Sequence, residues 1–206
     1  CMEPGVTAAR IYVTAPNGGD FGLAAERALG VSETFALPVS GRPPMFPSME
    51  PMPGGAFLQV WRGRIVTARA NVLRFSQPLA YHVHDPIRDH VTMPQRITFL
   101  VAMAGGLWVG QRDRAVFLAG DQPAALQVLT RHAGAPVPGS ATLALPGDLS
   151  GELGMSELAV WLSEYGYVAG TATGEAISLQ KTALHGLSGA SGTSVVFGRR
   201  AYTAVN

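Results

Sequence analysis

The sequence predicts an all-β fold made of repeated units of short strands. Three observations lead to this prediction: an apolar pattern that recurs four times, a glycine in a turn of each copy, and frequent Gly and Pro between the apolar segments. The chain has 25 Gly and 15 Pro among 206 residues. Such frequent turn residues are typical of many short elements and favour an all-β class.

Each of the four copies is an apolar strand, a turn with glycine and a second apolar strand, often followed by a third. The copies cover residues 56–76, 97–119, 158–179 and 193–205. Their turn glycines, Gly63, Gly106, Gly166 and Gly198, are separated by 43, 60 and 32 residues. The mean, about 45, is the length of one four-stranded β-propeller blade. Glycine suits tight hairpins because such turns need a positive φ.

These repeats predict a single β-propeller-like domain over residues 1–206, with about four to five blade units and an incomplete last one. An earlier unit begins with the β-rich segment 9–14 and the turn 16–19. A proline-rich crossing segment covers residues 40–55, and the long gap between repeats contains an insertion at 131–155.

Two segments fit a helix as well as a strand. Residues 20–30 have an N-cap residue, good helix formers and a final glycine, so both interpretations stay open there. Residues 156–166 also fit three turns of an amphipathic helix. We favour a strand for this second segment because its glycine-centred pattern repeats the one around Gly63 and Gly106.

Composition and charge exclude several classes. Apolar residues make up 47% of the chain and charged residues 14%, with a net charge of +1. The charges are well mixed, so no basic run predicts sequence-specific nucleic-acid binding. The longest mostly apolar stretch, residues 97–110, is too short for a membrane-spanning helix. Low charge is typical of a surface partly buried against partners.

The single cysteine is residue 1, which excludes an internal disulfide. Three interpretations of this first residue stay open: the lipidated cysteine of a bacterial lipoprotein, an N-terminal nucleophile, and the start of a fragment of a longer propeller chain. We favour the fragment, because no flexible tether follows and no base for a nucleophile is evident.

The densest polar cluster lies at residues 81–90. His82, His84, Asp85 and His90 are candidate metal ligands, since neutral imidazole and carboxylate both bind metals. The spacing differs from that of metallo-β-lactamase-like hydrolases, so a polar loop between blades is the favoured interpretation. No catalytic motif stands out, and no pair is singled out among Glu152, Glu157, Glu164 and Glu175.

Trp61, Trp108 and Trp161 occupy comparable places in three repeats. They are candidates for a ligand-binding platform, as in sugar-binding modules. The favoured interpretation is that they fill the space between neighbouring sheets, as aromatic side chains on blade strands do.

Several segments resemble the strands of bacteriophage virion β-propellers. They are VWRGRIVTA at 60–68 with LRFSQPL at 73–79, GLWVG at 106–110 with VFLAGD at 116–121, GAPVPG at 134–139, and VWLSEYGYVAG at 160–170. Proteins of this kind form the tail nozzle or hub of short-tailed phages, as tail tubular or packaged-DNA-stabilising proteins. The resemblance spans roughly residues 9–205 and consists of blade patterns, and it is poorest at the beginning and at 131–155.

The resemblance implies a structural protein of the virion, without enzymatic activity or cofactor. Its partners would be other copies in a ring around the DNA channel and neighbouring tail or connector proteins. A near-neutral charge suits a channel wall along which DNA slides, because each phosphate contact adds affinity. Two alternatives stay open: a carbohydrate-binding propeller using the tryptophans, and a hydrolase in which His82, His84 and Asp85 converge.

Overall fold

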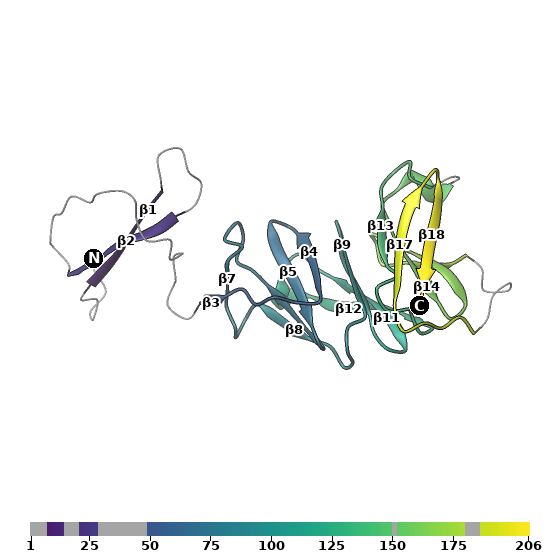
Figure 1. Ribbon diagram of the computed structural model, residues 1–206, viewed down its shortest axis with the longest axis horizontal. Coiled ribbons are helices and arrows are strands. Elements are labelled where there is room, and N and C mark those ends of the chain that lie inside the picture. Colours follow the sequence, from purple (N-terminus) through teal and green to yellow (C-terminus); the bar gives the residue numbers. More distant parts are fainter. Residues whose placement is uncertain (1–7, 15–20, 29–48, 150–151, 180–185) are drawn as a thin grey trace. The chain divides into compact units, whose positions relative to one another are not determined.

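The computed structural model describes residues 8–14, 21–28, 49–149, 152–179 and 186–206 (Figure 1). Its contacts divide the chain into two compact units, Cys1–Glu50 and Pro51–Asn206, where the sequence predicted a single domain. Within the described residues all regular elements are strands apart from two short 3₁₀ turns. The all-β prediction is therefore confirmed.

The first unit contains one antiparallel pair, β1 (Ala8–Thr14) with β2 (Phe21–Ala28). The register shifts between Ile11 and Tyr12, and Arg10 Nε forms an ion pair with Glu26 Oε2 at 3.0 Å. The segment that fitted either helix or strand is thus a strand, because pairing with β1 satisfies its backbone groups. The predicted turn at 16–19 and most of the proline-rich segment lie outside the described residues.

The second unit contains three four-stranded antiparallel sheets and a terminal hairpin. In each four-stranded sheet the strands are arranged in the order in which they occur along the chain, and in the first sheet β7 falls between β6 and β8 in sequence. The first sheet is β4 (Phe57–Trp61), β5 (Arg64–Arg69), β6 (Val72–Phe75) and β8 (His90–Thr92). The second sheet is β9 (Phe99–Met103), β10 (Gly106–Gly110), β11 (Arg114–Ala119) and β12 (Gln127–Ala133).

The third sheet is β13 (Thr142–Ala144), β14 (Leu158–Ser163), β15 (Gly166–Thr171) and β16 (Ala176–Ser178). The terminal hairpin pairs β17 (Gly192–Phe197) with β18 (Arg200–Val205). The remaining short elements are β3 (Glu50–Pro51), β7 (Val83–His84), η1 (Pro123–Ala125) and η2 (Glu152–Met155). The strand favoured over a helix at 156–166 is confirmed as β14.

The segment 131–155, predicted as an insertion, includes parts of two sheets. Its first residues end β12, and its middle supplies β13, the first strand of the third sheet. β13 has three residues, too few to show a period of two, so the sequence pattern did not reveal it. The connection from β13 to β14 includes η2. Gly166 follows the second strand of its sheet, whereas Gly63 and Gly106 follow the first.

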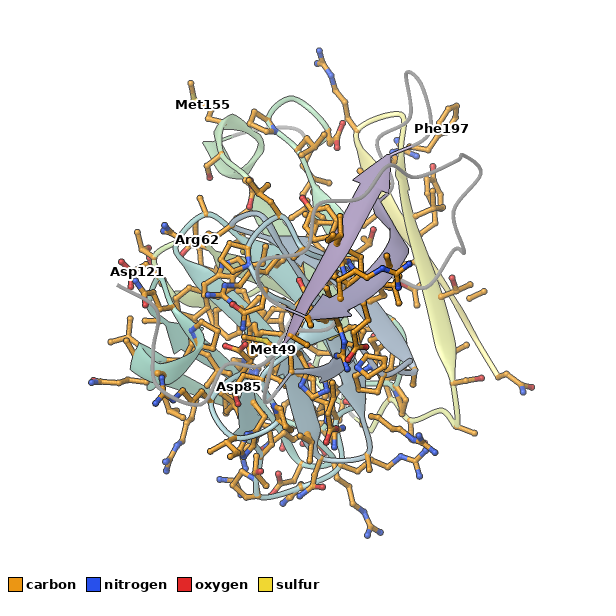
Figure 2. All side chains as sticks on the ribbon, turned by 90° about the vertical axis from the view of Figure 1, so that its left-hand side faces the viewer. Met49, Arg62, Asp85, Asp121, Met155 and Phe197 are labelled. Atoms are coloured by element: carbon orange, nitrogen blue, oxygen red, sulfur yellow. The ribbon has the colours of Figure 1, made fainter. Side chains whose placement is uncertain are left out.

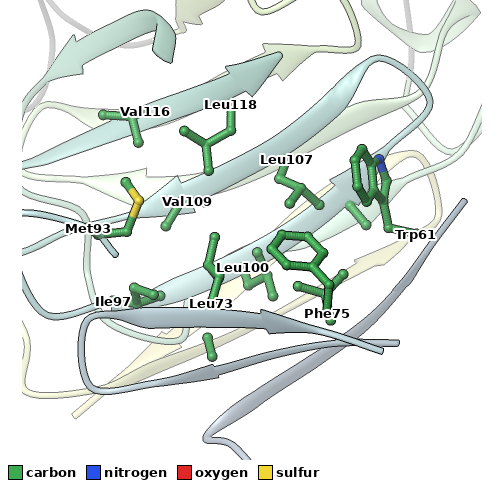
Figure 3. Packing of buried hydrophobic residues seen from close by; sticks show 13 residues of the cluster. Trp61, Leu73, Phe75, Met93, Ile97, Leu100, Leu107, Val109, Val116 and Leu118 are labelled. Carbon is green, nitrogen blue, oxygen red and sulfur yellow. The ribbon is translucent and has the colours of Figure 1, made fainter. Parts of the chain in front are cut away.

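The sheets stack in chain order through three hydrophobic clusters. The first cluster joins the first and second sheets through side chains such as Leu73, Phe75 and Leu107 (Figure 3). The second joins the second and third sheets, and the third joins the third sheet to the terminal hairpin. Alternate residues of β9 point to opposite clusters, so every residue of that strand is buried. This two-sided burial explains the unbroken apolar run FLVAM.

Two of the four turn glycines lie in two-residue hairpin turns. Arg62 and Gly63 have φ values of 48° and 71°, and Gly198 and Arg199 have 57° and 64°. Positive φ at both central residues is what a type I′ turn requires, as the sequence predicted. Gly106 is different, because it begins β10 and its φ lies outside that region. The reason for glycine there is space, since a Cβ would lie 2.1 Å from the carbonyl oxygen of Leu118.

We expect Gly106→Ala to lower the free energy of unfolding by about 1–3 kcal/mol, because the new methyl group meets the backbone of β11 and the strands must separate. Urea unfolding followed by tryptophan fluorescence measures this loss. Gly54→Ala is the matched control, since a Cβ at Gly54 has nothing within 4 Å. An equal effect of the two substitutions would contradict the steric explanation.

Candidate functional site

The four candidate metal ligands follow the loop between β6 and β8 without converging. His84 is buried, His82 and His90 are exposed, and Asp85 is half-buried. Among the side chains that the structure describes, no group of three or more His, Cys, Asp or Glu could hold a metal. Asp85 Oδ1 accepts hydrogen bonds from the backbone N–H of Ile87 at 2.8 Å and of Arg88 at 3.2 Å. Its carboxylate therefore organises the turn at 85–88.

A buried polar network in the same loop was not singled out from the sequence. Asp89 accepts hydrogen bonds from Gln77 Nε2 and from the backbone N–H of Asp85, and its Oδ1 lies 3.5 Å from Arg64 Nη1. The same Arg64 nitrogen donates to the carbonyl oxygen of Ser76 at 2.7 Å. This network fixes the long connection between β6 and β8 to the start of β5. Its role is structural, since its groups satisfy one another.

The three candidate tryptophans are all buried, with 2% or less of each exposed. Trp61 packs edge-on against Phe75 in the first cluster, with ring centroids 5.8 Å apart. Trp108 and Trp161 face each other in the second cluster at 5.1 Å. A sugar has no open indole face on which to stack at these positions. The arrangement agrees with the interpretation that aromatic side chains fill the space between sheets.

The terminal hairpin has an exposed apolar face. Val195, Phe197 and Tyr202 are 57%, 76% and 50% exposed, and Val195 pairs with Tyr202 across the strands. The opposite face packs Val196 and Ala201 against the third sheet. Figure 2 shows Phe197 at the end of the terminal hairpin. A two-stranded sheet with apolar residues on both faces is typical of an element that is covered on both sides.

Hydrogen bonds fix this hairpin to the rest of the second unit. The backbone N–H of Gly192 donates to the carbonyl oxygen of Pro138 at 2.7 Å, and Tyr167 Oη donates to Thr203 Oγ1 at 2.9 Å. Ser194 Oγ donates to the carbonyl oxygen of Ser140. The exposed face is therefore held in a defined orientation before any partner binds, which lowers the entropic cost of association.

An open depression of about 280 Å³ lies at the ends of β4 and β9. Its lining is mostly apolar, with Arg62 and Glu157 as the charged members, and consists of Val60, Trp61, Arg62, Ala102, Met103, Ala104, Leu143 and Glu157. Arg62 Nη2 donates to the carbonyl oxygen of Ala104 at 2.7 Å, and its guanidinium lies 5.9 Å from the Trp61 ring centroid. Glu157 is half-buried and has no hydrogen bond or ion pair among the described residues.

No family model matches this chain, and none of the curated protein sequences gives a significant match. No helix among the described residues is long and apolar enough to cross a membrane.

The sequence contains one signal for the exposed apolar face of the hairpin. Val195, Val196 and Phe197 are consecutive apolar residues in a strand, so neighbouring side chains point to opposite faces. Consecutive apolar residues in the last strand pair thus indicate burial on both sides. The depression has no comparable signal, because its lining comes from positions up to 97 residues apart in the sequence.

Proposed function

We propose that this protein is a structural component that assembles with copies of itself into a ring. The observation that carries the proposal is the exposed apolar face of Val195, Phe197 and Tyr202 on a hairpin fixed to the third sheet. Large exposed aromatic side chains on a rigid element are typical of protein–protein interfaces. An enzyme or a sugar-binding module has no comparable support from the described side chains.

We further propose that the ring belongs to a phage virion, in the tail nozzle, hub or connector that surrounds the DNA channel. The resemblance of the repeats to virion β-propellers supports this placement, as do the blade-like four-stranded sheets stacked in chain order. The net charge of +1 is compatible with a wall along which DNA moves without strong binding. The other partners would then be adjacent tail or connector proteins.

We expect native mass spectrometry of the full chain to show a closed oligomer of one defined copy number. Val195→Glu should shift this species towards the monomer, because a buried carboxylate without a partner is costly at an interface. The control is Ile87→Glu, which changes an isoleucine that is 77% exposed in the loop between β7 and β8. A monomer at high concentration of the unchanged chain would contradict the proposal. Co-purification with intact phage particles on a density gradient tests the placement in a virion.

A further inference from the structure

We infer that copies meet through two different surfaces, with the tip of the terminal hairpin of one copy seated in the depression beside Trp61 of the next. The inference rests on the proposed self-assembly and names its contact. Each copy would provide one tip and one depression, so the contact is heterologous. Such contacts form a ring when the rotation between copies closes, and an open filament when it does not.

The tip of the terminal hairpin, which we define as Phe197, Arg199 and Arg200, presents an exposed aromatic side chain that can act as an anchor. Phe197 ends β17 at the turn and is 76% exposed, the largest exposed fraction among the described aromatic side chains. Arg200 pairs with Phe197 across the hairpin, and Arg199 lies in the turn itself. The tip therefore presents one aromatic ring beside two cationic side chains. Neither arginine side chain has a hydrogen bond or ion pair among the described residues.

The depression has room for this anchor. A closed apolar cavity of about 150 Å³ is enough to bind benzene, and the open depression measures about 280 Å³. Val60 and Leu143 line it with apolar side chains that are 64% and 37% exposed. Arg62 already lies over the Trp61 ring, so a second ring can pack against the same guanidinium.

The charges are complementary at the same place. Glu157 lines the depression without a partner among the described residues, and the tip brings Arg199 and Arg200. An ion pair that forms while Phe197 excludes water fixes the orientation of the contact. Arg62 carries the same sign as the tip, but the carbonyl oxygen of Ala104 and the Trp61 ring hold it. Glu157 is therefore the group that an incoming arginine meets favourably.

The occupant is a second copy, because the hairpin does not fill the depression of its own chain. Phe197 is exposed, and the hairpin packs on the third sheet through the third cluster. The depression lies at the ends of β4 and β9, which belong to the first two sheets, and the third sheet contributes Leu143 to its lining. Both surfaces are thus open on one molecule at the same time.

The test mixes two variants of the full chain. Phe197→Glu removes the anchor and keeps the depression, whereas Glu157→Arg repels the tip and keeps the anchor. We expect each variant alone to self-associate roughly thirty-fold more weakly than the unchanged chain. Mixed together, they should form a one-to-one dimer and nothing larger, because one intact contact remains and it cannot propagate. Analytical ultracentrifugation measures both results.

Arg88→Glu and Glu175→Arg are the matched controls, since they reverse charges on exposed side chains elsewhere and should leave assembly unchanged. Circular dichroism checks that each variant folds. Assembly of the unchanged chain without dimers in the mixture would overturn the inference and leave the proposed function standing. Absence of assembly in the unchanged chain would overturn the proposed function itself.

Discussion

Trp161→Ala is expected to lower the free energy of unfolding by about 3–5 kcal/mol, because it empties the space between the second and third sheets. The Trp161 side chain is fully buried, and its ring centroid lies 5.4 Å from that of Phe99 and 5.1 Å from that of Trp108. These rings belong to the second sheet, so the substitution weakens the contact between sheets rather than one strand pair. Urea unfolding followed by circular dichroism measures the loss.

Conservative variants separate packing from hydrogen bonding at this contact. Trp108 Nε1 donates to the carbonyl oxygen of Thr171 at 3.0 Å, whereas Trp161 Nε1 is buried with no partner among the described residues. Trp161→Phe keeps most of the ring and removes an unpaired donor, so it should cost less than Trp108→Phe. Tyr81→Ala, at a side chain that is 41% exposed, controls for loss of an aromatic ring. A Trp161→Ala variant as stable as this control would contradict the prediction.

Asp89→Ala should also cost about 3–5 kcal/mol, because it leaves the Arg64 guanidinium without its buried partner. The side chains of Arg64 and Asp89 are 15% and 10% exposed. Removing Asp89 also takes an acceptor from Gln77 Nε2 and from the backbone N–H of Asp85. The loop between β6 and β8 would lose one of its attachments to the first sheet. The urea midpoint of the variant measures the effect.

A double-mutant cycle with Arg64→Met isolates the pair, and we expect a coupling free energy of about 1–3 kcal/mol. The contrasting control is the pair formed by Asp113 and Arg114, whose nitrogen and oxygen lie 2.6 Å apart with side chains 48% and 39% exposed. Hydrogen bonding to Arg114 lowers the pKa of Asp113 to about 2. Asp113→Ala should nevertheless leave the urea midpoint unchanged, because solvent screens an exposed pair. Equal losses at Asp89 and Asp113 would contradict the assignment.

The strands with strong apolar patterns could be predicted from the sequence, whereas β8, β12 and β13 could not. The segments around Gly63 and Gly198 became hairpins with the expected turns, because local backbone geometry alone selects glycine there. β12 was missed because Val128 and Leu129 are exposed and mixed with polar residues, so its sequence shows no alternation of apolar and polar residues. At Gly106 the sequence predicted a tight turn with positive φ, whereas glycine is needed there because the backbone of Leu118 lies too close for a Cβ. Leu118 lies on another strand, so this contact does not show in the residues around Gly106.

The residues of the candidate site could likewise be predicted from the sequence only in part. His82, His84, Asp85 and His90 are close in sequence, yet they differ in burial and form no group of metal ligands among the described residues. Trp61, Met103 and Glu157 lie on separate elements and meet only after the sheets stack. A surface built from the ends of stacked sheets depends on long-range packing, which a linear pattern does not encode.

The stacking of sheets in chain order also bears on how such a chain can change in length. Each hydrophobic cluster joins sheets that are neighbours in sequence, so cooperativity passes from one sheet to the next as it does in repeat proteins. Duplication of one coding segment would add a sheet and a cluster without rearranging the others. The added sheet would need an apolar face to rest on, and the exposed face of Val195 and Tyr202 already has that character. The surface that we assign to contact between copies is therefore also where the array could lengthen within one chain.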